Sequence, residues 1–461
     1  MSAEKLRKRR PEQPWEQIDT TKYKFVRKVN YDAKFATFHW PKRISSLLYI
    51  FEKLVPEEFI QSILSSYDTD SEKWLVRDGK RLYKARVDIQ KVYQTLAVQI
   101  FLIGQQSGDI DNATRPLRAS IFSAKSHLEN ESKKLGSSVQ KYELITSRFH
   151  IASDDYDLLS RQFQKAVVQL GEILVCDEKL YFFSGESKHI CLVITKPDRV
   201  GLWMYEACVK TEWDNLSFLV DICMKEGKSF EEDSTAINTI VTRWENILKN
   251  YPPQIPAPKL VFDSYYFDNT TRLNLNERNV AYEASAKPDR LKQLDIHFDG
   301  INKPGDVMMK SYSYSKFFNY YSSGDWATIW CEGTGELVSR KYEKKKGLGI
   351  KTVVTNAFKK VPIGRGDTLA KHTIPAYDQY EAEFGVCDRF NSQLGDAKWP
   401  FRRGGRNVSG ESGTQHSFAI ATILINTFNA HRSIHRTDKS AYQFSRYCKE
   451  LSLALFEKYA Y

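Results

Sequence analysis

The chain has 461 residues, of which 41% are hydrophobic and 27% are charged, and this is enough material for two or three folded domains. No stretch approaches eighteen consecutive apolar residues, and the first fifteen residues lack an apolar signal core, so we expect neither a membrane span nor secretion. The seven cysteines occur singly, without the paired spacing of a zinc site, which indicates reduced thiols in an intracellular protein.

The net charge of +11 is concentrated at the two ends of the chain. Residues 1–30 carry +5 and residues 389–461 carry +6, so the middle of the chain sums to zero. Basic segments gain affinity for phosphates by releasing counterions, so this asymmetry indicates a polyanionic partner; a solvated surface with a basic tail is the alternative. The cluster Lys5–Arg10 predicts a disordered basic tail and import into the nucleus.

The first part of the chain has helical periodicity. Apolar side chains recur at intervals of three and four residues over 44–55, 89–101 and 159–170, which predicts amphipathic helices around a core. We therefore expect an all-helical N-terminal domain.

After residue 170 the period changes from helix to strand. A helix is predicted over 235–251, ended by two prolines. The β-prone runs around it are bounded by turn-forming residues, and the first three are close enough to form an antiparallel meander. These runs are 173–176, 190–195, 203–209, 258–263 and a further one near 280.

Residues 290–370 mix Gly, Pro and Lys with short β-prone pieces, and we interpret them as an inserted subdomain. Residues 378–394 then predict a helix that carries Asp388. Strands, a helix, further strands, an insertion and a final helix are the element order of an RNase H-like domain. The predicted fold class is therefore α/β, with an RNase H-like mixed sheet flanked by helices.

Three aspartates take the positions at which an RNase H-like nuclease carries its metal ligands. Asp177 follows the first predicted strand, Asp263 ends the fourth, and Asp388 lies on the late helix. Adjacent parallel strands would bring the first two together, and three such carboxylates hold two Mg²⁺ or Mn²⁺ ions for strand cleavage. An aspartate after a strand also commonly forms a turn or caps a helix. The alternative acids in a looser scheme are Glu178, Asp268 and Asp396.

Several blocks of the sequence resemble the piggyBac transposase family. "DEKLYFFSG" followed by "KPDRVGLWMYEACV" is similar to the family's first-aspartate block, and "LVFDSYYFDNTTRLNLN" is similar to its second. "GVCDRFNSQL", with "KWP" and "INTFNAH" further on, resembles the third, and "ITSRFHIA" resembles the family's helical Arg-Phe motif. The resemblance covers roughly residues 40–435.

This resemblance implies that Asp177, Asp263 and Asp388 are the catalytic, metal-binding triad of a DDE/D transposase. It implies strand cleavage by water, strand transfer by a 3′-hydroxyl, two Mg²⁺ or Mn²⁺ ions, binding to double-stranded transposon ends, a homodimer, and insertion at TTAA targets.

The third block leaves a choice of alignment. Where the family often has a further acid three positions after the third aspartate, this chain has Asn391, which can bind a metal through its amide oxygen but adds no charge. A strict match would place Cys387 opposite the family's aspartate. Asp388 is preferred because its spacing to Asn391 puts both side chains on one helical face.

Candidate DNA contacts follow the third block. Arg402, Arg403 and Arg406 lie in a loop with two glycines and can grip phosphates, and Trp399 can stack on a base. An ordinary exposed loop and a tryptophan packed against its own domain are the alternatives.

Near the C-terminus, four basic or imidazole side chains either face a nucleic-acid backbone or cap a helix. These are His431, Arg432, His435 and Arg436. The Cys/His-rich zinc module with which family members commonly end is not seen, since the chain stops at "FEKYAY".

The sequence thus predicts six segments and a transposase, or a host-adopted derivative, as the function. The alternatives are a non-catalytic DNA-binding or chromatin protein on the same scaffold and a generic RNase H-like nuclease. The segments are a basic disordered tail (1–25), a helical dimerisation and DNA-binding domain (26–170), the first part of the RNase H-like catalytic domain (171–290), the insertion subdomain (291–370), the last helix of the catalytic domain (371–396) and a C-terminal helical DNA-binding segment (397–461).

Overall fold

The structure is a computed structural model that describes discontinuous ranges of the chain. These are residues 35–40, 46–68, 76–77, 80–81, 87–106, 151–182, 187–193, 199–213, 216–225, 234–250, 258–287, 307–308, 326–331, 336–344, 348–357, 375–397, 411–436 and 443–459.

The chain divides into two compact units. Unit one contains Phe35, Leu170–Asp177 and the described part of Glu231–Gly385. Unit two contains the described residues of three segments, which are Ala36–Gln169, Glu178–Phe230 and Val386–Tyr461.

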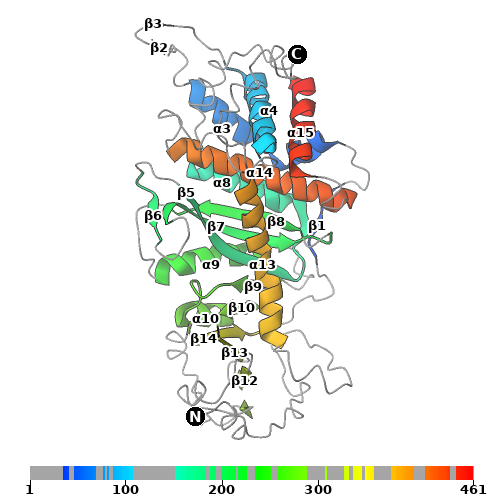
Figure 1. The fold of residues 1–461 in the computed structure, drawn as a ribbon. Coiled ribbons are helices and arrows are strands. Elements are labelled where there is room, and N and C mark those ends of the chain that lie inside the picture. Colours follow the sequence, from blue (N-terminus) through cyan, green and yellow to red (C-terminus); the bar gives the residue numbers. More distant parts are fainter. Residues whose placement is uncertain are drawn as a thin grey trace. The chain divides into compact units, whose positions relative to one another are not determined.

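Unit one is built on a mixed sheet (Figure 1), in the order β11-β12-β13-β14-β10-β9-β5. The strands β5, β9 and β10 run parallel, whereas β10 to β11 pair antiparallel through β14, β13 and β12. The bounds are β5 Ile173–Phe182, which continues into unit two, β9 Lys259–Phe262, β10 Tyr282–Ser285, β11 Val307–Met308, β12 Trp326–Cys331, β13 Glu336–Lys344 and β14 Leu348–Thr355.

Helices cover both faces of this sheet. Side chains alternate along β10, so Tyr282 and Glu283 point to opposite faces. Tyr282 donates to Glu336, which also accepts at 2.9 Å from Nε of Arg272 in α10 (Asn269–Glu277). On the other face, Glu283 shares the buried Lys259 with Glu383 of α13 (Pro375–Asp396). The helices α10 and α13 therefore lie on opposite sides of the sheet.

The helix α9 (Ser234–Lys249) packs beside α10 in unit one. Its Ile237, Val241 and Trp244 are buried at intervals of three and four residues, and the ring of Trp244 meets that of Tyr266 edge-on at 4.9 Å. Polar contacts also join the two elements, including a hydrogen bond of 2.8 Å that Arg278 donates to the buried Glu245. The apolar stripe predicted for this helix is the face that it buries.

A buried charge cluster joins α13 to the sheet. The Lys259 side chain is 0% exposed and contacts two carboxylates, Glu283 and, at 2.8 Å, Glu383. The pKa of Glu283 is raised from 4.5 to about 8, chiefly by burial and also by the nearby Glu383 charge, while Lys259 opposes the rise. The Glu283 carboxyl therefore holds a proton at neutral pH, which lessens the charge buried in the core.

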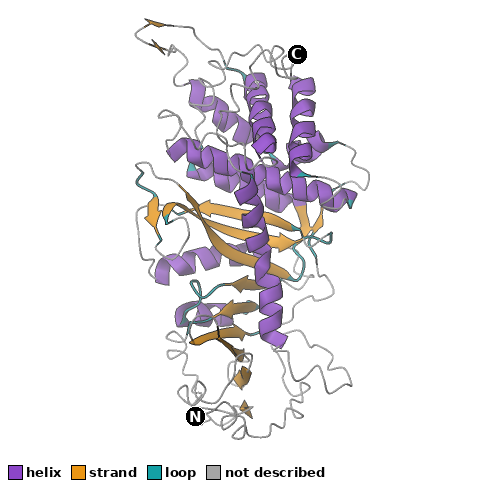
Figure 2. Cartoon of the chain, in the orientation of Figure 1, coloured by secondary structure: helices purple, strands orange, loops and turns teal. Residues whose placement is uncertain are grey.

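Unit two is mostly helical, with an antiparallel sheet of β6, β7 and β8 (Figure 2). The helices α4 and α15 lie side by side, and α8 and α14 both contact β8. The bounds are β1 Thr37–Phe38, α2 Leu47–Leu54, α3 Glu57–Asp68, β2 Val76–Arg77, β3 Lys80–Arg81, α4 Ile89–Gln106, α8 Ser153–Ala166, β4 Val167–Gln169, β6 Ile190–Leu192, β7 Val200–Lys210, β8 Ser217–Met224, α14 Glu411–His435 and α15 Phe444–Tyr459.

Side chains from two helices satisfy the backbone of β8 on the side away from β7. The Asn426 amide of α14 both accepts from the N–H and donates to the C=O of Leu219, each at 2.8 Å. The Ser160 hydroxyl of α8 does the same for Ile222 at 2.9 Å. An edge strand with unpaired groups invites pairing with other chains, so these contacts protect it.

The predicted fold class is confirmed, because unit one is a mixed sheet flanked by helices. The element list differs in three places. The N-terminal region is not all-helical, because the short strands β1 to β4 lie within it and β4 replaces the predicted end of the helix near residue 170. The strand β8 was absent from the prediction, and the first strand does not end before Asp177 but continues to Phe182. Of the segment interpreted as an insertion, β13 and β14 pair onward from β10, so the described strands extend the sheet. No helix among the described residues is long and apolar enough to cross a membrane.

Replacing Gly104 in α4 should destabilise unit two. A Cβ at this position would lie 2.6 Å from Cys448 Cβ and 3.1 Å from the Ser445 carbonyl oxygen of the neighbouring α15. We expect Gly104→Ala to lower the free energy of unfolding by about 1–3 kcal/mol, as overpacking does. The matched control is Gly395→Ala in α13, where nothing lies within 4 Å and the helix gains about 0.5–1 kcal/mol. Urea unfolding of both variants checks this, and equal effects of the two substitutions would contradict the close approach of α4 and α15.

The charge cluster should make stability depend on pH. The folded-state pKa of Glu283 is raised, so its contribution to the free energy of unfolding is fully present below about pH 4.5. This contribution is lost as the pH rises to about 8, and the free energy of unfolding falls by roughly 1.4 kcal/mol per pH unit. Glu283→Gln cannot ionise, so the difference in unfolding free energy between this variant and the wild type should change in favour of the variant across this window. Urea unfolding at pH 5, 7 and 8.5 measures it, with Glu381→Gln at an exposed site of α13 as the control. A constant difference at all three pH values would contradict the assignment.

Candidate active site

The structure brings Asp177 and Asp263 together at the end of a parallel ladder. In β5 and β9, Ile173 lies opposite Lys259 and Cys176 lies opposite Phe262. Phe262 is the last residue of β9. The residue that follows each member of this last pair is an aspartate, Asp177 after Cys176 and Asp263 after Phe262. The two carboxylates therefore occupy equivalent positions on adjacent strands, both in unit one.

Asp177 is held inside a strand rather than after one. It is the fifth residue of β5 and is only 8% exposed. Partners in a parallel register share a face, and side chains alternate along a strand, so Asp177 lies on the face of the sheet that carries Lys259 and α13. Glu178 is directed to the opposite face, which separates it from the pair.

Asp263 begins the turn that follows β9. Its Oδ1 accepts a hydrogen bond of 2.6 Å from the backbone N–H of Tyr265, which fixes the side chain against its own backbone. The following Tyr266 and Phe267 are buried and anchor the turn in the core. Asp268, one of the alternative acids, is the N-cap of α10 and accepts from the Thr271 N–H at 2.7 Å. The structure thus gives Asp268 a capping role.

Tyr380 of α13 lies against the end of β9. Its hydroxyl contacts the Phe262 carbonyl oxygen at 3.4 Å, and its side chain is 8% exposed. Burial raises the pKa of Tyr380 well above its ordinary value, and the charges of Asp263, Asp177 and Glu283 add to the rise, which a hydrogen bond with the Ser285 side chain only partly offsets. The phenol therefore stays protonated beside the two carboxylates.

Two neighbouring carboxylates of this kind suit a divalent cation. Like charges at adjacent strand ends repel, and a cation bound between them removes the repulsion. The donor set consists of carboxylate oxygens, which Mg²⁺ and Mn²⁺ prefer to nitrogen or sulfur. Asp263 is half-buried rather than enclosed, so the pair is reachable from solvent. The residues present therefore fit such an ion.

Asp388 and Asn391 belong to the part of α13 that lies in unit two. The Asp388 side chain is exposed, whereas Cys387 is fully buried in the core and Asn391 is 9% exposed. A buried thiol is out of reach of a hydrated ion, which favours Asp388 over Cys387. The Asn391 Oδ1 accepts no hydrogen bond from any described residue. Within the described ranges, no group of three or more His, Cys, Asp or Glu side chains is close enough to hold a metal ion.

The predicted DNA contacts are only partly within the described chain. Trp399, Arg402, Arg403 and Arg406 lie outside the described residues. The predicted basic tail and the nuclear signal within it also lie outside them.

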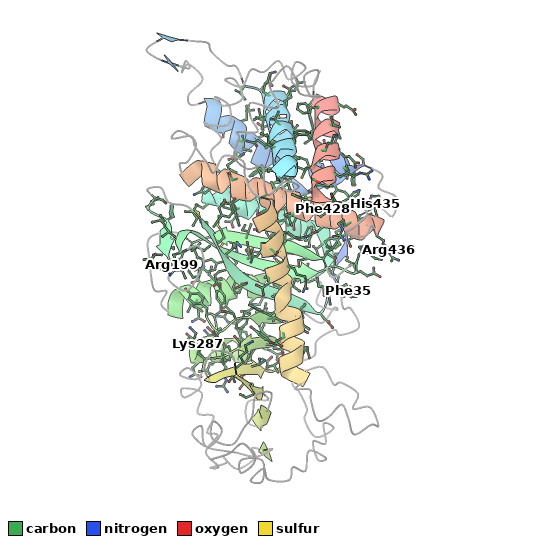
Figure 3. All side chains as sticks on the ribbon, in the orientation of Figure 1. Phe35, Arg199, Lys287, Phe428, His435 and Arg436 are labelled. Atoms are coloured by element: carbon green, nitrogen blue, oxygen red, sulfur yellow. The ribbon has the colours of Figure 1, made fainter. Side chains whose placement is uncertain are left out.

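The C-terminal group of basic side chains on α14 divides by burial. His431 and Arg432 are buried, and the Arg432 guanidinium lies 5.6 Å from the centre of the Phe428 ring. These two side chains are therefore not positioned to contact a nucleic-acid backbone. His435 and Arg436 are exposed at the end of the helix (Figure 3), and Arg436 lies 3.6 Å from Glu212.

Four residues on the face of the sheet that carries the aspartate pair were not predicted from the sequence. They are Lys259, Glu283, Tyr380 and Glu383. A signal existed for two of them, since a charged residue stands within each of the β-prone runs "KLVF" and "YEAS". In a strand that is buried on both faces, such a residue requires a buried partner of opposite charge.

No family model matches the chain, and no curated protein matches it. Among solved structures, it is similar to the cryo-EM structure of a piggyBac transposase synaptic complex with hairpin DNA. The TM-score is 0.67 at 12% sequence identity, and the match covers 93% of this chain and 83% of that chain. At this identity the likeness concerns the fold alone. The chain therefore has the fold of a piggyBac transposase.

Proposed function

We propose that the protein is a DNA transposase of the DDE/D type, or a derivative of one, that cleaves and joins DNA strands with the help of divalent cations. The observation that carries the proposal is the pair Asp177 and Asp263 at the end of the β5–β9 ladder, in a fold like that of piggyBac transposase. The fold alone hosts more than one activity, so the proposal depends on the carboxylates.

Asp177 and Asp263 would hold the cation pair, and Asp388 with Asn391 would complete the set from α13. Two Mg²⁺ or Mn²⁺ ions in such a site supply an activated oxygen nucleophile and stabilise the leaving oxygen. The protein's part is to keep Asp177 rigid inside β5 and Asp263 rigid in its turn, so that little reorganisation is needed when the phosphate arrives.

The proposed substrate is double-stranded DNA. The similar solved protein was seen as a synaptic complex with hairpin DNA, and this chain carries a net charge of +11. By the resemblance of its sequence blocks, we further propose that it acts in the nucleus as a homodimer on transposon ends and inserts at TTAA. Arg402, Arg403, Arg406 and Trp399 are the proposed DNA contacts.

Removing either carboxylate of the pair should abolish cleavage. We expect Asp177→Asn and Asp263→Asn each to lower Mg²⁺-dependent cleavage by about a thousandfold or more, since such groups act as a unit. The assay uses a duplex that contains the DNA flanking the coding region, with and without Mg²⁺. Binding of this duplex should be largely retained, because the change leaves the basic segments untouched.

The matched control is Asp268→Asn, which makes the same chemical change five residues away. Asparagine caps a helix as well as aspartate does, so cleavage and stability should both persist. Full cleavage by Asp263→Asn with Mg²⁺ would overturn the proposal, as would loss of cleavage in all three variants without loss of fold.

A DNA-binding or chromatin protein without catalysis is the second candidate. Asn391 favours it, because the site would carry one negative charge fewer than a set with a fourth acid. Titration with Mn²⁺ separates the two candidates. A catalytic site should bind the ion in the micromolar to millimolar range and lose affinity in each of Asp177→Asn, Asp263→Asn and Asp388→Asn.

A further inference from the structure

The hydroxyl of Tyr380 contacts Phe262, the residue immediately before Asp263. The side chain projects from α13 and is buried, and its hydroxyl lies 3.4 Å from the carbonyl oxygen of Phe262, to which it can donate. Phe262 ends β9 and immediately precedes Asp263. A hydrogen bond to this carbonyl fixes the peptide that leads into Asp263, at the point where the ladder no longer holds the backbone.

The ring of Tyr380 has little freedom to turn away. It stacks on the ring of Phe384 one helical turn later, with centroids 5.3 Å apart and planes inclined by 16°. The nearby ion pair of Lys259 with Glu383, at 2.8 Å, fastens the same turn of α13 to β9. Helix, ring and hydroxyl are therefore held together as a rigid group.

The surroundings keep the hydroxyl a donor. Burial raises the pKa of Tyr380, a hydrogen bond with the Ser285 side chain offsets part of the rise, and the charges of Asp263, Asp177 and Glu283 raise it further, so the phenol stays protonated at neutral pH. A protonated phenol is a neutral group that can stand beside two carboxylates without repelling them. A negatively charged tyrosinate at this position would repel the two carboxylates and compete with them for a bound cation.

We propose that Tyr380 is a positioning residue that presets Asp263, and with it the Asp177–Asp263 pair, for a divalent cation. This inference rests on the proposed function, since it concerns the same site. Groups that orient metal ligands without touching the metal typically change metal affinity by 10–100-fold when they are removed. Tyr380 contacts the backbone beside the ligand, so its effect is expected at the lower end of that range.

The test measures binding of Mn²⁺ alone to the full chain, by titration calorimetry or by the electron paramagnetic resonance signal of the free ion. Tyr380→Phe removes only the hydroxyl, and we expect it to raise the Mn²⁺ dissociation constant about 10-fold. The matched control is Tyr156→Phe in unit two, which removes another buried tyrosine hydroxyl that donates to a backbone carbonyl, that of Gln415 at 2.9 Å. The control should lose similar stability in urea and keep the wild-type dissociation constant, so a purely structural effect is recognised.

The outcomes separate this inference from the proposed function. Wild-type Mn²⁺ affinity in Tyr380→Phe, together with lost binding in Asp263→Asn, would overturn the role of Tyr380 and leave the proposed function standing. Absence of Mn²⁺ binding in the wild type, or its persistence in Asp263→Asn, would overturn both. Should Tyr380→Phe not fold, Phe384→Leu keeps the hydroxyl and removes the stacked ring; weaker Mn²⁺ binding supports the inference and unchanged binding overturns it.

Discussion

The parallel pairing of β5 with β9 is the interaction on which the candidate site depends. Four residues of each strand pair in a ladder whose members are buried, and the ladder ends where the two aspartates begin. Parallel neighbours require a long connection, and here β6, β7, β8 and α9 supply it. The chain thus brings residues 86 positions apart to one edge because the hydrophobic strands preceding them pair, and not because the carboxylates attract one another.

Buried charge fixes how α13 packs on the sheet of unit one. An apolar helix can slide or rotate on a sheet with little penalty, whereas Lys259 can meet Glu283 and Glu383 together in only one register of α13. We interpret the cluster as a device for specificity rather than for stability, because burying three ionisable groups gains little free energy. On the opposite face, Glu336 has a similar role toward Arg272 of α10.

Much of unit one could be predicted from the sequence, because its signals are local. The stripe of α9, the apolar run of β9 and the aspartate that follows it are all legible in a few consecutive residues. The length of β5 was not legible, because "DEKLYF" carries three charges, and only the tertiary environment keeps such a segment extended. The strand β8 was missed because its run lacks the alternation of a half-buried strand and includes Ser217 and Asp221, polar residues that the fold buries. Tyr380 could not be found at all, since its role depends on where α13 packs.

The shortness of β9 limits how the chain can vary in length. With four residues in the strand, loss or gain of a single residue between Lys259 and Asp263 would exchange the two faces, moving Lys259 away from α13 or Asp263 away from Asp177. The connections elsewhere have no such constraint, because loop closure becomes only slowly more costly with length. Insertions and deletions among related chains should therefore gather outside the stretches 173–177 and 259–263, and these two stretches should keep a fixed number of residues even where their side chains differ.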